Sequence, residues 1–330
     1  PTLTLCKHRG TWYGLPALNG PTLMYYNKDL FDEAGLDYPT MDWDDKSWTW
    51  EAALELGKQL TKDYGDPINA QYGWIQNRQN VEGPPMIFGK FVWPEDAYDT
   101  GFAESVDITD PAVIEAYQRH HDLVFKDQVS PDGPAGEALS QLGGAFESGH
   151  VAMLETGGWG WWIYSTNIDT TAEEGFCWGV APMPWGSPDA KERAVIYTDP
   201  WVITRGLEGQ DLDDAWTFVK FLIREDNARA YMQAGNVPPT QHKLQEEWFQ
   251  QFECMDAEDV KEVYQGAFRY GFESSNHLLV RWDELNQIWG NVLSEYFNDP
   301  DGNTAEVMAQ LEQDLNDALK RIAEDEGHEF

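Results

Sequence analysis

The sequence predicts an α/β protein with a helical C-terminal section. Patterns typical of short apolar strands alternate with amphipathic helical patterns through the first two thirds of the chain, and from Asp211 onward the periodic segments are helical. Such alternation is typical of helices packed on a sheet. The chain has 330 residues, of which 42% are hydrophobic, which is enough for two domains and a large buried core.

The charge of the chain restricts its partners. Fifty-eight acidic residues against 22 basic ones give a formal net charge of −36. This excess argues against nucleic acid or an anionic membrane as a partner, and it disfavours a strongly anionic ligand. No apolar run approaches the roughly 18 residues of a membrane span.

The cysteines and histidines do not predict a metal site. Cys6, Cys177 and Cys254 are far apart, odd in number and without a C-x-x-C pair, so we predict neither a zinc site nor a disulfide framework. His120 and His121 are neighbours and therefore point to different faces, which favours structural roles. No cofactor is predicted.

Local signals place the first elements. The apolar run 22–26 predicts a strand, and 27–35 predicts a short helix that ends at Gly35. Ser47 or Thr49 is the predicted N-cap of an amphipathic helix that follows. A strand is also predicted at 71–75.

Later segments follow the same rules. Asp110 and Pro111 predict the start of a helix, with aspartate as N-cap and proline at the first position. Strands are predicted at 175–184 and 195–204, the second of them at an edge or with a break because it contains Pro200. Helices are predicted from 211 to about 234, from 282 to 297 and from 304 to 326.

Three tryptophans stand among three glycines in the stretch 155–167, directly after the predicted strand 151–154. Glycine permits close backbone approach, and indole offers a flat apolar face. In open α/β sheets, ligands bind beyond the carboxyl ends of strands, so this stretch predicts a binding loop. Trp159, between glycines, is the leading candidate, with Trp161 beside it. A core role is the alternative, above all for Trp162.

Five motifs occur in a familiar order. They are Trp12-Tyr-Gly-Leu-Pro16, Tyr25-Tyr-Asn-Lys-Asp-Leu-Phe31 with Ala34-Gly-Leu36, Ser47-Trp-Thr-Trp50, Ala145-Phe-x-x-Gly-x-Val-Ala-Met153 with Gly158-Trp159, and Gly235-x-x-Pro-Pro239. Over residues 7–320 the chain resembles the extracellular solute-binding proteins of sugar ABC transporters, the group that includes maltose-binding protein. Each motif is weak alone, but together and in this order they are fairly specific.

The resemblance implies a two-lobe, periplasmic-binding-protein-like fold of type II, in which hinge segments cross between lobes that close on a sugar. Members of the group begin with about a hundred further residues, so the resemblance implies an incomplete N-terminal lobe. The expected division is a remnant of the N-terminal lobe at 1–20, the C-terminal lobe at 21–197, a return to the N-terminal lobe at 198–252, and C-terminal lobe helices at 253–330.

The resemblance also implies ligand contacts. Trp159 matches a tryptophan that stacks on sugar, and Trp282 lies near a second stacking aromatic. Asn80 and Glu82 fall on a sugar-facing loop, where they are expected to supply hydrogen bonds.

Further contacts are implied at the hinge strands. Asn19 lies at the hinge crossing, and Asp199 and Trp201 lie by the next hinge strand, where a structural role at the strand end is equally expected. Gly20 stands where maltose-binding protein has a carboxylate, which argues against maltose itself.

The predicted function is capture of a neutral sugar and its delivery to a membrane permease, without chemistry. The expected protein is a monomer outside the cytoplasm, lipid-anchored in its full-length form. A glycoside hydrolase is the second reading, and it would need two carboxylates about 5 to 9.5 Å apart. Glu155 and Asp199 are the only acids that we nominate. The third reading keeps the fold and binds a non-sugar solute, such as a polyol phosphate or a polyamine.

Overall fold

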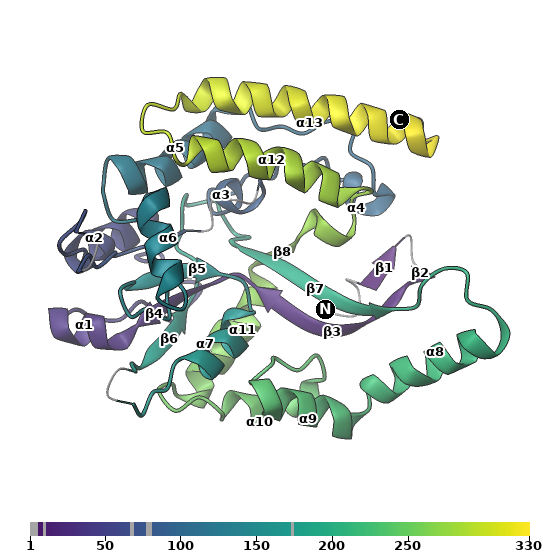
Figure 1. The fold of residues 1–330 in the computed structure, drawn as a ribbon, viewed down its shortest axis with the longest axis horizontal. Coiled ribbons are helices and arrows are strands. Elements are labelled where there is room, and N and C mark those ends of the chain that lie inside the picture. The colour runs from purple at the N-terminus through teal and green to yellow at the C-terminus, as the bar shows by residue number, and fades with distance from the viewer. Residues whose placement is uncertain (1–5, 9–10, 67–68, 77–80, 173–174) are drawn as a thin grey trace.

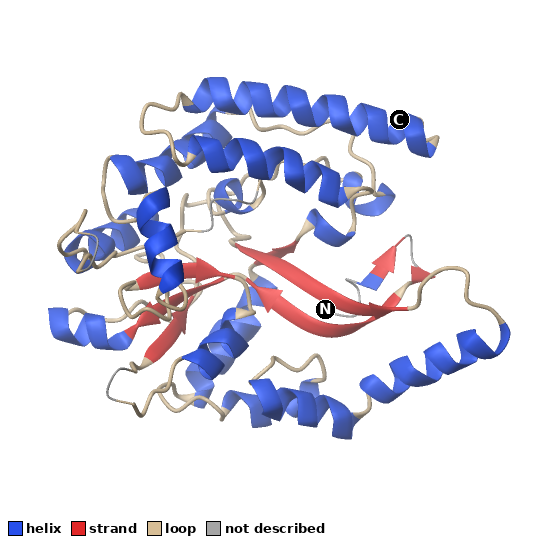
Figure 2. Ribbon diagram, in the orientation of Figure 1, coloured by secondary structure: helices blue, strands red, loops and turns tan. Residues whose placement is uncertain are grey.

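The computed structural model describes residues 6–8, 11–66, 69–76, 81–172 and 175–330, and its fold is drawn in Figure 1. Figure 2 shows strands at the centre, with helices around them. Within the described residues the strands form two three-stranded sheets and one short two-stranded sheet, β1 (Lys7–His8) with β2 (Thr11–Trp12).

The first sheet has the strand order β5-β4-β6. Its central strand β4 (Leu23–Asn27) is buried at every position and pairs antiparallel with β5 (Met153–Thr156) and with β6 (Trp178–Ala181). This is the strand that the apolar run 22–26 predicted. The predicted strand at 71–75 instead makes only isolated bridges, at Gln71, Tyr72 and Ile75.

The second sheet has the order β3-β7-β8. The long strand β3 (Gly14–Pro21) pairs antiparallel with β7 (Ala194–Val202), and the first residues of β7 pair in parallel with β8 (Gly271–Glu273). Figure 1 shows the β3 and β7 pair extending from the first sheet toward the opposite end of the molecule. Among the described strands, only β3 pairs with β7 at Pro200, so the proline is at an edge, as predicted.

Thr22 joins the two sheets. It is the one residue between β3 and β4, and it is 1% exposed. Its main-chain N–H donates to the Val195 carbonyl at 2.8 Å, and its Oγ1 accepts from the Val195 N–H at 2.8 Å. The chain therefore passes from one sheet into the other without a loop.

Helices cover both sheets and form two layers in Figure 1. Above the strands, α12 (Trp282–Tyr296) and α13 (Thr304–Glu326) pack with α5 (Pro111–Phe125) around one apolar core. The other helices are α1 (Lys28–Ala34), α2 (Trp50–Leu60), α3 (Gly83–Met86), α4 (Ala97–Thr100), α6 (Gly133–Gln141), α7 (Gly160–Asn167), α8 (Gly209–Leu222), α9 (Glu225–Gly235), α10 (His242–Phe249) and α11 (Ala257–Arg269). None of the described helices is both long and apolar enough to cross a membrane.

Capping residues begin and end several helices where the sequence predicted. The Asn27 side chain accepts from the N–H groups of α1, and Gly35 ends that helix with φ of 65°. Thr49, not Ser47, caps α2. Asp110 caps α5 by accepting from the Ala112 N–H at 2.7 Å. The helix predicted from 211 to 234 is two helices, α8 and α9, with a break between them.

Cys177 and Cys254 form a disulfide, which corrects the expectation that no such bond exists. The bond joins the segment before β6 to the segment after α10, across a sequence separation of 77 residues. Sequence spacing could not reveal this pairing, because the fold alone brings the two cysteines to a Cα separation of 5.5 Å. Cys6 is free and buried.

The two neighbouring histidines are structural, as predicted. His120 is fully buried, and its Nδ1 lies 2.7 Å from the Ala116 carbonyl. His121 bonds the Asp299 carbonyl through Nε2 at 2.9 Å and stacks on Tyr296. No group of potential metal-ligating side chains is found among the residues that the structure describes.

We predict that reduction of the Cys177–Cys254 bond lowers the free energy of unfolding by about 2 to 4 kcal/mol, because the bond closes a long loop in the unfolded chain. Urea denaturation with and without reductant measures this, with free thiols counted before and after. The control is the double variant Cys177→Ala/Cys254→Ala, whose midpoint should not respond to reductant. Equal midpoints for reduced and oxidised parent protein would contradict the prediction.

Candidate ligand-binding site at the strand crossing

Trp159 lies where the loop after β5 meets the end of β3. The loop passes through Gly157 and Gly158 and leads into α7, of which Trp159 is the N-cap residue. A Cβ added to Gly158 would lie 2.5 Å from the Gly20 Cα, and one added to Gly157 would lie 2.2 Å from the Trp159 ring. Only glycine fits at these two positions, so the glycines that surround the tryptophans permit a close crossing of two backbones.

Tyr197 packs against Trp159. The two ring centroids are 5.3 Å apart, with an interplanar angle of 53°. Tyr197 is also the direct partner of Gly20 in the β3 and β7 ladder, so the strand register places it there. Trp159 is only partly buried. Its indole is thus supported on one side while part of its surface stays open, an arrangement that suits stacking on a ligand.

Asn19 directly precedes Gly20 in β3. It is 1% exposed and pairs with Thr198, which is 3% exposed. Burial raises the pKa of Tyr264 on α11, which lies near the Asn19 side chain. Asn19 is therefore enclosed between β7 and α11.

Asp199 and Trp201 lie farther out along β7, where they pair with Leu18 and Leu15. Asp199 is exposed, and Trp201 is 41% exposed. Trp201 lines a cavity of about 250 Å³ with residues that include Tyr231 of α9, and Trp159 is not among the lining residues. The structure thus places Trp201 beside α9 and not beside Trp159.

Trp161 is a core residue, which corrects its assignment to the ligand. None of its surface is exposed, and its ring packs 5.0 Å from Trp248 and 4.9 Å from Phe252, measured between centroids. Trp162, for which a core role was the alternative, is only partly buried. The short helix α7 turns Trp161 inward, a direction that the density of tryptophan and glycine in the sequence could not indicate.

Glu82 is also interior, so its predicted contact with a sugar is wrong for this structure. It is 4% exposed, and its carboxylate accepts from the Ser275 N–H at 3.0 Å and from the Ser274 hydroxyl at 3.1 Å. Burial raises the pKa of this carboxyl, and the serine hydrogen bonds partly offset the rise. Asn80, the other candidate on this loop, lies outside the described residues.

Trp282 begins α12, a few residues after the serines that Glu82 holds. It is partly buried against Trp289, with ring centroids 5.6 Å apart. Glu82 therefore anchors the segment that leads to Trp282.

Sequence reasoning missed Tyr197, because only the register of β3 against β7 places it opposite Trp159.

The two acids nominated for hydrolysis differ in accessibility. Glu155 lies in β5 and is 5% exposed, whereas Asp199 is exposed. A general acid and its partner must both reach the glycosidic bond. The burial of Glu155 therefore argues against this pair as hydrolytic machinery.

We predict that Glu82→Gln reduces the dependence of stability on pH. The folded protein binds the Glu82 proton more tightly than the unfolded chain does, so the parent's stability should fall as the pH rises from the ordinary glutamate pKa near 4.5 through the raised pKa. Glutamine cannot ionise and can still accept from Ser275. Denaturation midpoints measured between about pH 4 and pH 8 give the dependence of stability on pH. This interval covers the rise of up to about 3 to 5 units that the pKa of a buried carboxyl group can show.

The control for that experiment is Glu137→Gln, which removes an equal charge from an exposed position on α6. Its profile should follow that of the parent. If Glu82→Gln loses stability with rising pH as steeply as the parent, Glu82 is not the group responsible.

Comparison with known proteins gives the family. The model of the family described as bacterial extracellular solute-binding protein matches residues 2–229. An arabinooligosaccharide-binding protein of Halalkalibacterium halodurans is 39% identical over 231 residues, covering 70% of this chain and 48% of the relative. An sn-glycerol-3-phosphate-binding periplasmic protein of Rhizobium meliloti is 23% identical over 247 residues, covering 73% and 52%. The chain thus spans about half the length of each of these two relatives.

A solved structure supports the same fold. The ABC substrate-binding protein Lmo0181 from Listeria monocytogenes, in complex with cycloalternan, has a TM-score of 0.73 and 20% sequence identity, covering 97% of this chain and 74% of that one. This likeness agrees with the two-lobe α/β architecture that the motifs predicted. Because the family model covers more than half of the sequence, the chain belongs to the bacterial extracellular solute-binding proteins.

Proposed function

We propose that this protein is the substrate-binding component of an ABC importer and that it captures a neutral sugar or oligosaccharide between its lobes. The observation that carries the proposal is Trp159, which is held by glycines at the strand crossing, supported by Tyr197 and left partly open. The C–H face of a sugar stacks on such an indole, and fixed polar groups nearby bind its hydroxyls. The similar arabinooligosaccharide-binding protein supports this ligand class.

An anionic solute is the second candidate, since the sn-glycerol-3-phosphate-binding protein is also similar. A phosphate group is bound most strongly by donors with positive charge. The contacts of Trp159 at the crossing include the uncharged residues Gly20 and Tyr197, and the chain as a whole carries a formal charge of −36. These features favour the neutral ligand.

We further propose that the protein delivers its ligand to a membrane permease outside the cytoplasm. A lipid anchor on the full-length protein would hold it at the membrane surface. Release would follow opening of the lobes about the β3 and β7 pair. The protein is proposed to act as a monomer and without cofactor. Trp282 is retained as a second stacking residue, and Asp199 and Asn80 as hydrogen-bonding residues that face the ligand.

We predict that Trp159→Ala weakens binding of a neutral oligosaccharide by about 2 to 4 kcal/mol, the range for a well-packed aromatic anchor, while the protein stays folded. Titration calorimetry against a panel of arabinose, galactose and glucose oligosaccharides measures the change. Trp216→Ala is the matched control, because it removes a tryptophan that is 45% exposed on α8. Its affinity should equal that of the parent.

Trp161→Ala separates packing from binding in the same series. Removing this fully buried ring should cost about 3 to 5 kcal/mol of stability. If Trp159→Ala binds sugar like the parent but unfolds as early as Trp161→Ala, Trp159 is a core residue and the proposed site is wrong.

We also predict that a bound oligosaccharide is returned intact. Glu155 is buried in β5, so the pair Glu155 and Asp199 does not offer two accessible carboxyl groups. Incubation of the protein with its best ligand, followed by an assay of reducing ends and chain length, checks this. Release of shorter sugars that disappears in Glu155→Gln or Asp199→Asn would instead establish a hydrolase.

A further inference from the structure

The excess of negative charge lies on the surface of the protein. The chain has 58 acidic and 22 basic residues. Among the described acidic side chains only Glu82 and Glu155 are buried, and among the described basic ones Arg193 is buried. The Arg193 guanidinium donates to main-chain carbonyls, among them those of Met183 and Ala190. The surface therefore carries nearly the whole excess of acid.

Many of the described basic side chains already pair with a particular acid. Arg119 pairs with Glu51 at 2.8 Å and with Glu115 at 2.9 Å, and Arg229 pairs with Glu247 at 2.9 Å. Further ion pairs are made by Lys58, Lys90, Lys126, Arg224, Lys243, Lys261, Arg269, Arg281 and Arg321. Few basic charges are therefore left to offset the other acids.

The imbalance is pronounced on the layer that α12 and α13 form in Figure 1. Helix α12 contains acidic residues but neither lysine nor arginine, and the basic residues of α13 are Lys320 and Arg321. Exposed acids of this layer that make no ion pair with a described residue include Asp283, Glu295, Asp317 and Glu324. These carboxylates face solvent without a matching positive charge.

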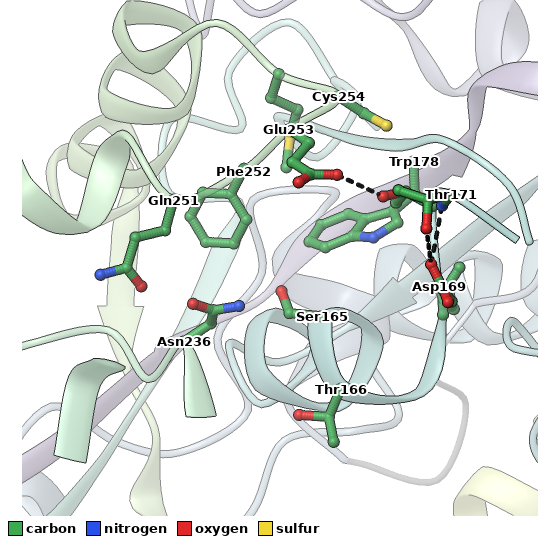
Figure 3. Close-up of a pocket in the computed structure, with 13 residues that line it drawn as sticks. Ser165, Thr166, Asp169, Thr171, Trp178, Asn236, Gln251, Phe252, Glu253 and Cys254 are labelled. Carbon is green, nitrogen blue, oxygen red and sulfur yellow. Dashed lines mark hydrogen bonds between the residues drawn. The ribbon is translucent and has the colours of Figure 1, made fainter. Parts of the chain in front are cut away.

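Acids without a basic partner also line a cavity of about 490 Å³ beside the disulfide, which Figure 3 shows. Glu253 accepts from the Thr170 hydroxyl at 2.9 Å, and Asp169 accepts from the Thr171 hydroxyl at 2.7 Å. No lysine, arginine or histidine is among the lining residues that the structure describes. A hydroxyl partner carries no charge, so the negative charge of each carboxylate stays uncompensated there.

Like charges on this surface repel one another in the folded state. Burial raises the pKa of Asp259, and the charge of Asp256 raises it further. The Debye length is about 30 Å at 0.01 M salt and about 3 Å at 1 M, so dilute salt leaves repulsion between neighbouring surface acids largely unscreened. In the unfolded chain the same charges lie farther apart, so their repulsion favours unfolding when salt is dilute.

We propose that this protein is adapted to concentrated salt and that the stability of its folded state depends on it. Dissolved cations gather around the acidic surface and screen it, without a defined binding site. The dependence arises from the surface as a whole, and the layer of α12 and α13 contributes strongly because its exposed acids are unpaired. This inference involves no ligand and is independent of the proposed function.

The test is urea denaturation of the protein in KCl from about 0.05 M to about 2 M, over which the Debye length falls from above about 10 Å to below about 3 Å. The midpoint should rise by at least about 1 M urea over this range. The steepness of the transition should stay the same, because salt changes the stability and not the surface that unfolding exposes.

A graded series at one set of positions shows whether charge is responsible. The first variant is Asp283→Asn/Glu295→Gln/Asp317→Asn/Glu324→Gln, and the second is Asp283→Lys/Glu295→Lys/Asp317→Lys/Glu324→Lys. In dilute KCl the midpoint should rise from the parent to the amide variant and again to the lysine variant. The response to KCl should decrease in the same order, because each step removes repulsion that salt otherwise screens.

The matched control removes acids that attract an arginine, and it is Glu51→Gln/Glu115→Gln/Asp226→Asn/Glu247→Gln. It changes the net charge as much as the amide variant does, but each substitution also loses an ion pair. Its midpoint in dilute KCl should therefore lie below that of the amide variant. Equal midpoints would contradict the inference that unpaired acids cause the effect.

Two other results would overturn the proposal. One is a parent midpoint that stays constant or falls as KCl rises. The other is an amide and a lysine variant that both keep the full response of the parent, because salt would then act through apolar surface and not through charge. Circular dichroism in concentrated KCl checks that each variant is folded, and if the lysine variant is not, the amide variant decides.

Discussion

The close approach of Gly20 to Gly158 is the contact on which the rest of the proposed site depends. Without side chains at these two positions, the end of β3 can lie directly against the loop after β5, and a single added Cβ would come within 2.5 Å of backbone. This contact fixes Trp159 above the strand crossing and sets Tyr197 against its ring. A methyl group at Gly158 would push the loop away from β3 and thereby move the indole that is proposed to stack on sugar, whereas one at Gly20 would lie 3.3 Å from the Gly158 nitrogen and needs a smaller adjustment.

The strand crossing is also where the two sheets are joined, which links binding to motion. Thr22 makes two hydrogen bonds to Val195 at the junction, and beyond it β3 and β7 continue as a two-stranded ribbon. A ribbon of this kind can twist more easily than a wide sheet covered by helices. The proposed ligand residue therefore lies next to the segment that would bend when the lobes open, so stacking on Trp159 could directly favour the closed form.

Buried polar groups hold the segments around the proposed sugar site. Glu82 accepts hydrogen bonds from Ser274 and Ser275, in the segment that leads to Trp282 at the start of α12. Asn19 lies enclosed under the crossing, between β7 and α11. Glu82 was expected to touch the ligand, and it is instead buried against the two serines. The cost of burying the Glu82 carboxylate is visible in its raised pKa.

The sequence by itself determined the local elements and the family. Caps at Thr49 and Asp110, the stop at Gly35 and the apolar run of β4 could be predicted, because each depends on interactions within a few residues. The motif order identified the solute-binding family, and the glycines around Trp159 indicated a loop with close backbone contact. Only the tertiary structure decided which tryptophan is core and which is open, because α7 turns Trp161 inward toward Trp248. It alone paired Cys177 with Cys254, buried Glu82 and placed Tyr197, since each of these depends on contacts between residues far apart in the chain.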